Sequence, residues 1–175
     1  MWQNREIKNT VRSFREERMT AITLDQANRI IGAILKRSAE LNCRPLSAVV
    51  VEPGCVVKAF QKEDGSSMIR FEMAYGKAYA ALALGRNSSL VRVRNEEKPA
   101  FMRYLIAASD DKIFPEGGGM LIRDGAGEVI GAVGVTGDSE ERDEELAAHG
   151  IRAAGLKTDE DCKDLGRTVN VRRTK

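Results

Sequence analysis

The first strong periodic signal runs from Thr23 to Leu41, where apolar residues recur with the spacing of an amphipathic helix. The repeating positions are Leu24, Ala27, Ile30, Ile31, Ile34 and Leu35. Thr23 stands three residues before Gln26, which is the spacing of a capping box, where each side chain accepts a free backbone N–H of the first turn. The pattern therefore predicts a long helix that begins after Thr23 and ends near Leu41.

Two β-rich runs follow on either side of a turn signal at Glu52-Pro53-Gly54, and they predict a hairpin over PLSAVVVEPGCVVKAFQ. The sequence DGSS at 64–67 closes this hairpin and offers an N-cap for the next helix. Gly85 is a natural stop for that helix, whose apolar positions are Ile69, Met73, Tyr75, Ala78 and Leu82. Its many alanines and glycines permit a sheet or another helix to approach closely.

The second half of the chain carries a similar series of signals. Residues 86–97 are polar and are interpreted as a loop, and Pro99 suits the first turn of a helix over PAFMRYLIAAS. The runs MLIRD and EVIGAVGVTG flank Gly125-Ala126-Gly127 and predict a second hairpin. Asp138 with Glu141 repeats the capping-box spacing, which predicts a last helix to about residue 154.

These elements predict an α+β domain, because hairpins with short turns make an antiparallel sheet and the helices must cover its faces. We expect the domain to span residues 21–156. Residues 1–20 are interpreted as a charged N-terminal arm, and residues 157–175 as a polar, basic and weakly structured C-terminal tail. A chain of 175 residues with 42% hydrophobic residues is long enough to bury one sizeable core.

Net charge and cysteine content indicate which partners and which cellular compartment to expect. The net charge of +2 is too small to argue for nucleic acid, and no stretch approaches the roughly 18–20 apolar residues of a membrane span. Cys43, Cys55 and Cys162 are odd in number and widely spaced, which favours reduced thiols over a disulfide framework or a zinc site. We therefore expect a cytoplasmic protein that binds neither nucleic acid nor membrane.

The glycine-rich stretch at 114–139, FPEGGGMLIRDGAGEVIGAVGVTGDS, invites comparison with nucleotide-binding loops. Gly125, Gly127 and Gly131 precede an apolar strand, whereas the glycines of a dinucleotide fingerprint precede a helix whose free N–H groups meet the pyrophosphate. Residues 136–139 lie at a strand-to-helix corner, but Asp138 is expected to cap the helix and would repel an anion. The pattern therefore argues against a nucleotide site.

The remaining candidates for chemistry are few. His149 is the one histidine, so no multi-histidine metal site is possible and no metal site is predicted. It suits a helix C-terminus, although a solitary histidine can also ligate haem iron. Lys77, in a helix of small residues with Glu72 five positions earlier, points either to solvent or into a pocket. Glu116, beside three glycines, lies either at a cavity mouth or in an exposed turn.

Three segments carry a resemblance to a known family: ITLDQANRIIGAILKRSAELNCRPLSAVVVEPGCVVKAFQKEDGSS, EMAYGKAYAALALGR and FPEGGGMLIRDGAGEVIGAVGVTGDSEERDEELAAHGI. Over about residues 21–156 the chain resembles the GlcG/HbpS-like haem-binding family, also called the haem-degrading domain family, which includes the C-terminal domain of PduO-type corrinoid adenosyltransferases. The shared positions are Lys77, Gly117, Gly118 and the pair Asp143-Glu144. The chain departs from the family where it has Gly119-Met120 near a usual proline, and RVRNEEKPAFMRYLIAASDD matches poorly.

The resemblance implies a profilin-like fold, with an antiparallel sheet flanked by helices on both faces, and assembly into homo-oligomers. It also implies the first hypothesis for function, which is non-covalent binding of haem or a related tetrapyrrole. In that hypothesis Arg70, Lys77 and Arg86 meet the propionates, and the glycines at 117–119 let the backbone approach the ligand. Iron ligation would fall to His149, Cys55, Tyr75, Tyr79 or a methionine.

Two other functions stay open at the level of sequence. One is a cofactor-independent catabolic enzyme for a carboxylated organic substrate, with Glu116 or Asp143 as general acid or base and Lys77 holding the carboxylate. The other is a structural or regulatory oligomer, in which the charged arm and the tail would matter most.

Overall fold

The structure, a computed structural model, describes residues 21–165. The predicted arm at 1–20 and the last part of the predicted tail, 166–175, lie outside the described residues. No helix of the described part is long and apolar enough to cross a membrane. The three cysteines are all free thiols.

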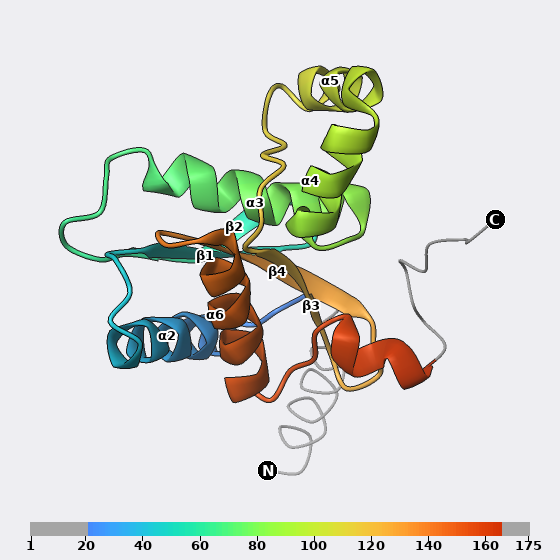
Figure 1. Cartoon of the computed structure of the whole chain (residues 1–175). Helices are drawn as coiled ribbons and strands as arrows, with labels where there is room; N and C mark the ends of the chain where they lie inside the picture. Colours follow the sequence, from blue (N-terminus) through green and yellow to red (C-terminus); the bar gives the residue numbers. More distant parts are fainter. Residues whose placement is uncertain (1–20, 166–175) are drawn as a thin grey trace, which may run out of the picture.

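The centre of the fold is a four-stranded antiparallel sheet in the order β2-β1-β4-β3 (Figure 1). The two predicted hairpins supply the strands, and the first strand of one hairpin pairs with the second strand of the other. The strands are β1 Ser47–Glu52, β2 Val56–Lys62, β3 Gly119–Arg123 and β4 Val129–Thr136. Both turns fall where the Pro-Gly and Gly-Ala-Gly signals predicted them.

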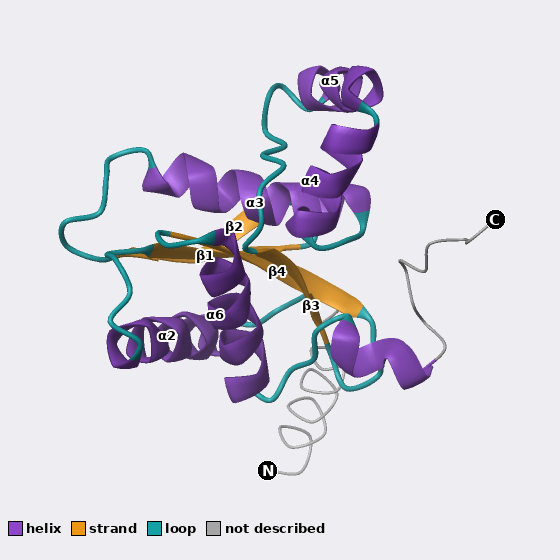
Figure 2. Ribbon diagram, viewed as in Figure 1, coloured by secondary structure: helices purple, strands orange, loops and turns teal. Residues whose placement is uncertain are grey.

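Helices cover both faces of the sheet, which confirms the predicted α+β class (Figure 2). One face carries α2 and α6, and the other carries α3, with α4 and α5 beyond it. Alternate residues of β1 serve the two cores, because Ala48 and Val50 pack with α2 and α6 while Val49 and Val51 pack with α3. The helices are α2 Leu24–Glu40, α3 Arg70–Leu84, α4 Ser88–Glu97, α5 Pro99–Ala108 and α6 Glu140–Ala153.

Of the four predicted helix caps, two form in the structure and two do not. The Thr23–Gln26 capping box forms, and Gly85 ends α3 in the left-handed conformation. The DGSS sequence does not cap α3, because the helix begins only at Arg70 and has no side-chain cap. Asp138 does not cap α6 either. Ser139 takes that place by accepting the backbone N–H of Arg142, and the carboxylate of Asp138 accepts the N–H of Arg44, 2.9 Å away.

The polar stretch 86–97 was predicted as a loop, and that prediction is wrong because residues 88–97 form α4. The helix is held by a satellite core in which Val91 packs with Ala80 and Met102. Few of its residues are apolar, so periodicity gave little signal, and tertiary packing decided the local structure.

Residues 157–165, predicted to begin a weakly structured tail, pack on the body instead. Lys157 forms a β-bridge with Arg123 at the open edge of β3, and the Arg123 guanidinium pairs with Asp159 at 2.6 Å. A 3-10 helix follows at Glu160–Leu165, and Cys162 within it is buried. The segment therefore covers a strand edge that would otherwise offer free backbone groups to another chain.

The small residues of α3, which left either a sheet or a helix open as the neighbour, allow the helix to lie directly on the sheet. A Cβ atom built on Gly134 of β4 would stand 1.9 Å from the carbonyl oxygen of Ala74 in α3. By contrast, a Cβ on Gly32 of α2 would have nothing within 4 Å.

We expect Gly134→Ala to lower the free energy of unfolding by about 3 kcal/mol, because backbone must move to admit the methyl group. Gly32→Ala is the matched control and should raise it by about 0.5–1 kcal/mol, since alanine replaces glycine in an exposed helical position. Urea denaturation of both variants measures the difference. Equal effects of the two substitutions would contradict the close packing of α3 on β4.

Candidate functional site

The glycine triplet lies between α3 and the start of α6, and its last residue, Gly119, begins β3. Gly118 has a φ of +105° and a Cβ there would be 2.5 Å from the carbonyl oxygen of Val135. A Cβ on Gly119 would be 2.1 Å from the carbonyl oxygen of Lys77, and one on Gly117 would be 2.8 Å from Oε2 of Glu140. The triplet therefore lets the backbone approach α3, β4 and α6 of the chain itself.

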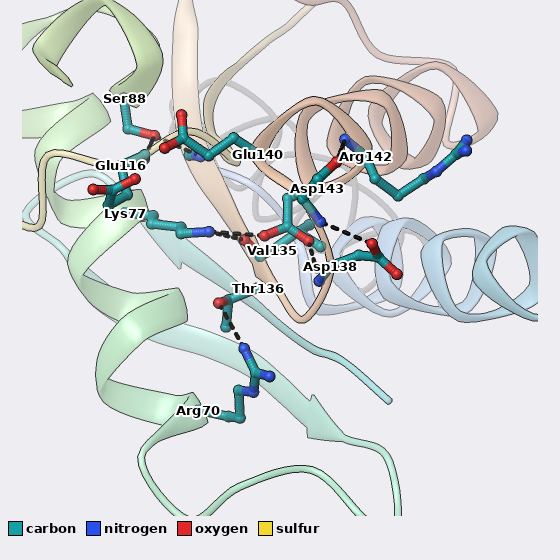
Figure 3. Close-up of polar contacts among 12 residues, drawn as sticks. Arg70, Lys77, Ser88, Glu116, Val135, Thr136, Asp138, Glu140, Arg142 and Asp143 are labelled. Atoms are coloured by element: carbon teal, nitrogen blue, oxygen red, sulfur yellow. Dashed lines mark hydrogen bonds and ion pairs between the residues drawn. The ribbon is translucent and has the colours of Figure 1, made fainter. Parts of the chain in front are cut away.

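A buried ion pair lies beneath these glycines. Nζ of Lys77 in α3 donates to Oδ2 of Asp143 in α6 at 2.8 Å, and to the carbonyl oxygen of Val135 at 3.1 Å (Figure 3). The side chains are 4% and 2% exposed. The other carboxylate oxygen of Asp143 accepts the backbone N–H of Asp138 at 3.1 Å. The pair therefore joins helices that cover opposite faces of the sheet.

Its geometry limits what this pair does chemically. The ammonium of Lys77 is enclosed and already has two acceptors, so in this arrangement it has no access to a substrate carboxylate. A buried pair of this kind adds little to stability compared with apolar residues, but loss of one partner is costly because it strands a charge. Lys77 and Asp143 are therefore partners of each other within the fold.

Glu116 and Glu140 form a second titratable pair at the surface of the same centre. A hydrogen bond with Glu140, then burial and the charge of Glu140, raise the pKa of Glu116 to about 7. The same hydrogen bond lowers the pKa of Glu140, and the N–H of Gly117 and the charge of Arg92 act in the same direction. Nε of Arg92 in α4 lies 2.9 Å from Oε2 of Glu140. Of the two carboxyls, Glu116 is therefore the one that is protonated as pH falls below about 7.

The backbone on both sides of Gly117-Gly118 is fixed by Ser88, the first residue of α4. The Ser88 hydroxyl donates to the carbonyl oxygen of Glu116 and accepts the N–H of Gly119 at 2.7 Å. Ser88 is fully buried. Ser88, in the stretch predicted as a loop, is thus part of the site. The sequence did not indicate it because its contact with Gly119 spans 31 residues.

An apolar cavity of about 500 Å³ opens beside the N-terminal half of α3. Phe114, from the segment between α5 and β3, packs against Gly76, where a Cβ would be 2.7 Å from the Cβ of Phe114. Phe71 and Tyr75 stack with ring centroids 5.8 Å apart, and the Tyr75 hydroxyl donates to the carbonyl oxygen of Cys55 at 3.1 Å. The lining residues are Ile69, Phe71, Glu72, Met73, Tyr75, Gly76, Asp111, Lys112 and Phe114.

The structure separates the predicted site residues into two groups. Lys77, Glu116, Asp143 and the glycines at 117–119 lie close together, and Glu140, Arg92 and Ser88, which the sequence did not indicate, lie with them. Arg70 lies apart, with its guanidinium directed at the sheet and 3.3 Å from Oγ1 of Thr136 (Figure 3).

The predicted candidates for an iron ligand are also separated. Tyr75 and one methionine, Met73, line the cavity. His149 is exposed on α6, on the other face of the sheet. The cavity itself had no sequence signal, because its walls come from a helix face and from a distant loop.

Comparisons with known proteins agree with this fold. The family model described as "Haem degrading protein HbpS-like" matches residues 22–152. An uncharacterized 15.0 kDa protein in the dhaT-dhaS intergenic region of Citrobacter freundii is 28% identical over 134 residues, which are 76% of this chain and 92% of that protein. The crystal structure of Klebsiella pneumoniae protein ORFY superimposes with a TM-score of 0.69 at 26% identity, covering 77% of this chain and 90% of that one.

Two further structures share the fold at lower identity. The PduOC:heme complex superimposes with a TM-score of 0.70 at 22% identity, covering 79% of this chain and 98% of that one. The HbpS crystal structure has a TM-score of 0.65 at 22% identity, covering 75% of this chain and 89% of that one.

We expect Lys77→Met to lower the free energy of unfolding by about 3–5 kcal/mol, because it leaves the Asp143 carboxylate buried without a counter-charge. Adding Asp143→Asn should restore part of that loss, since the amide oxygen still accepts the Asp138 N–H. Urea denaturation of the single and double variants gives the coupling energy. Strictly additive losses would show that the two side chains do not form the pair.

A second prediction concerns pH. Because the pKa of Glu116 is raised from 4.5 to about 7, the folded state holds a proton that the unfolded state releases across this window. Stability should therefore be highest below pH 4.5, as far as Glu116 contributes, and should fall as pH rises to about 7. Glu140, whose pKa is lowered from 4.5, contributes stability that is fully present across this window and is lost only as pH falls below it.

Thermal melts from pH 5 to pH 8 test the prediction on the native chain and on Glu116→Gln. The amide keeps a hydrogen-bond donor for Glu140 but does not titrate, so the downward slope should flatten in the variant. The same slope in both proteins would assign the pH dependence to other groups.

Proposed function

Since the chain belongs to the HbpS-like haem-degrading protein family, we propose that it binds haem or a related tetrapyrrole non-covalently in the apolar cavity beside α3. The observation that supports this proposal is the wall of the cavity, where Phe71, Tyr75 and Phe114 line a volume of about 500 Å³. Aromatic and aliphatic walls with a few polar groups at the rim are typical of cofactor sites. One structural relative, PduOC, is a complex with heme.

The residues of the cavity fit the chemistry of a tetrapyrrole. The rings would contact the flat faces of the macrocycle, and burial of that apolar surface would supply most of the affinity. The thioether of Met73 and the phenol of Tyr75 are the groups that would face the iron. Lys112 at the rim is the cation that would meet a propionate, and Glu72 and Asp111 would disfavour propionates on their own side.

In this proposal the residues predicted from the sequence hold the cavity in place. Lys77, Asp143 and the glycines at 117–119 anchor the end of the segment that carries Phe114. Arg70 follows Ile69 and precedes Phe71, both of which line the cavity, so its anchorage on Thr136 orients the start of α3. Their proposed role is therefore positioning.

A second candidate function is catalysis on a carboxylated substrate, and the observation that favours it is Glu116. A carboxylic acid whose pKa is about 7 is matched to general acid or base work at neutral pH. In this function Glu116 would transfer the proton, while Lys77 and Asp143 would hold the loop. Turnover that survives Glu116→Gln would rule out this assignment.

We also propose that the chain works in the cytoplasm as a homo-oligomer. Its three free thiols suit a reducing compartment. Exposed apolar side chains gather on the edge strand β2 and before α3, where Val56, Val57, Met68 and Ile69 are 57%, 40%, 92% and 56% exposed. Light scattering should give the mass of an oligomer, and Val56→Lys should lower that mass.

Haemin titration tests the binding proposal. The native chain should shift the Soret band and saturate at one haemin per chain, because one cavity is filled. Met73→Trp should abolish the shift by filling the cavity, and Lys112→Glu should weaken binding about tenfold by replacing an attraction to the propionate with a repulsion.

His149→Ala is the matched control, because His149 is exposed on the opposite face and its loss should leave the titration unchanged. An absent Soret shift in the native chain, or a shift lost in His149→Ala but kept in Met73→Trp, would overturn the proposed site.

A further inference from the structure

The apolar cavity beside α3 is closed at one end by a direct contact between its two walls. Gly76 of α3 and Phe114 of the segment between α5 and β3 both line the cavity. The backbone N–H of Phe114 donates to the carbonyl oxygen of Gly76 at 3.2 Å. A Cβ atom built on Gly76 would be 2.7 Å from the Cβ of Phe114 and 3.3 Å from the carbonyl oxygen of Lys112. The two walls therefore meet at Gly76, and a side chain there would force them apart.

The other end of the cavity opens toward solvent. Ile69, the residue immediately before α3, also lines the cavity and is 56% exposed. Gly76 lies about two helical turns further on, roughly 10 Å along the axis at about 1.5 Å per residue. The cavity therefore runs along the first half of α3, from an open end at Ile69 to a closed end at Gly76.

The wall that carries Phe114 is held on both sides of this residue. Before it, Ile113 is 5% exposed and packs in the satellite core with Val91. After it, the Ser88 hydroxyl donates to the carbonyl oxygen of Glu116. The wall can move away from α3 only if these attachments loosen. The width of the closed end is therefore set by the fold before any ligand arrives.

The aromatic residues of the helix wall favour a flat ligand. Phe71 and Tyr75 both line the cavity. They stand one helical turn apart on α3, and the planes of their rings differ by only 17°. An aromatic side chain makes its most extensive contact with another flat aromatic surface. A narrow closed end and aromatic walls therefore suit the same shape of ligand.

We propose that Gly76 and Phe114 determine the specificity of the cavity by admitting only the edge of a flat ring system. This inference rests on the proposed binding function and names the shape of ligand that the cavity selects. A flat macrocycle enters edge-first, because it is no thicker than an aromatic ring, and its edge reaches the place where the walls meet. A ring system with bulky groups that stand out of its plane would collide with the wall at Phe114 before reaching that place.

Paired titrations with two iron porphyrins test the proposal. Haemin is flat, whereas iron meso-tetra(sulfonatophenyl)porphyrin carries phenyl rings that stand out of the plane of the macrocycle. The native chain should bind haemin and reject the phenyl-substituted porphyrin. Phe114→Ala should weaken haemin about tenfold, because it removes an aromatic contact. The same variant should admit the substituted porphyrin, because it opens the closed end.

Gly76→Ala tests the other side of the contact. Its methyl group must push Phe114 away from α3, so this variant should also lose the discrimination between the two porphyrins. Neither substitution changes the charge of the chain, so the ratio of the two dissociation constants reports shape. Gly125→Ala is the matched control, because a Cβ there would have nothing within 4 Å, and it should keep the native ratio. Thermal melts show which variants are folded, and Phe114→Ala decides the matter if Gly76→Ala is not.

Equal binding of both porphyrins to the native chain would overturn the proposal, and so would discrimination that survives in Phe114→Ala. Pyrene, a flat hydrocarbon without iron or carboxylates, separates this inference from the haem function. If the native chain binds pyrene but not haemin, and Phe114→Ala weakens pyrene, the haem function fails and the selection of flat ligands stands. If the native chain binds neither haemin nor pyrene, both proposals fail.

Discussion

The arrangement of the candidate site depends on the ion pair between Lys77 and Asp143. The two faces of the sheet have separate apolar cores, and α3 and α6 cover opposite faces. The two side chains meet beside the end of β4, where Nζ of Lys77 also donates to the carbonyl oxygen of Val135. A buried ion pair is stable only when each charged group has close hydrogen-bond partners. The loop that covers the pair comes so close that it has no room for a side chain. That constraint explains Gly118, whose Cβ would be 2.8 Å from the Cβ of Asp143.

The same anchor places the segment between α5 and β3. Ser88 and the Glu116–Glu140 pair hold its glycine-rich end, and Phe114 rests on Gly76 of α3. The part of this segment between those contacts and α5 forms a wall of the apolar cavity. The polar centre and the cavity are therefore parts of one unit, because the same stretch of backbone contributes to both.

The sequence by itself determined the element types where apolar residues repeat with a clear period. It placed α2, both hairpins, α3, α5 and α6. The family resemblance marked Lys77, Gly117, Gly118 and Asp143 as shared positions, and Glu116 was a candidate because it stands beside the glycines. It failed at α4, where too few apolar residues mark the period, and at the caps of α3 and α6, where several polar residues compete. Only the tertiary structure decided that Lys77 pairs with Asp143, 66 residues away, and that Phe114 completes a cavity. The physical reason is that periodicity reports which face of an element is buried, whereas the partner on that face is set by long-range packing.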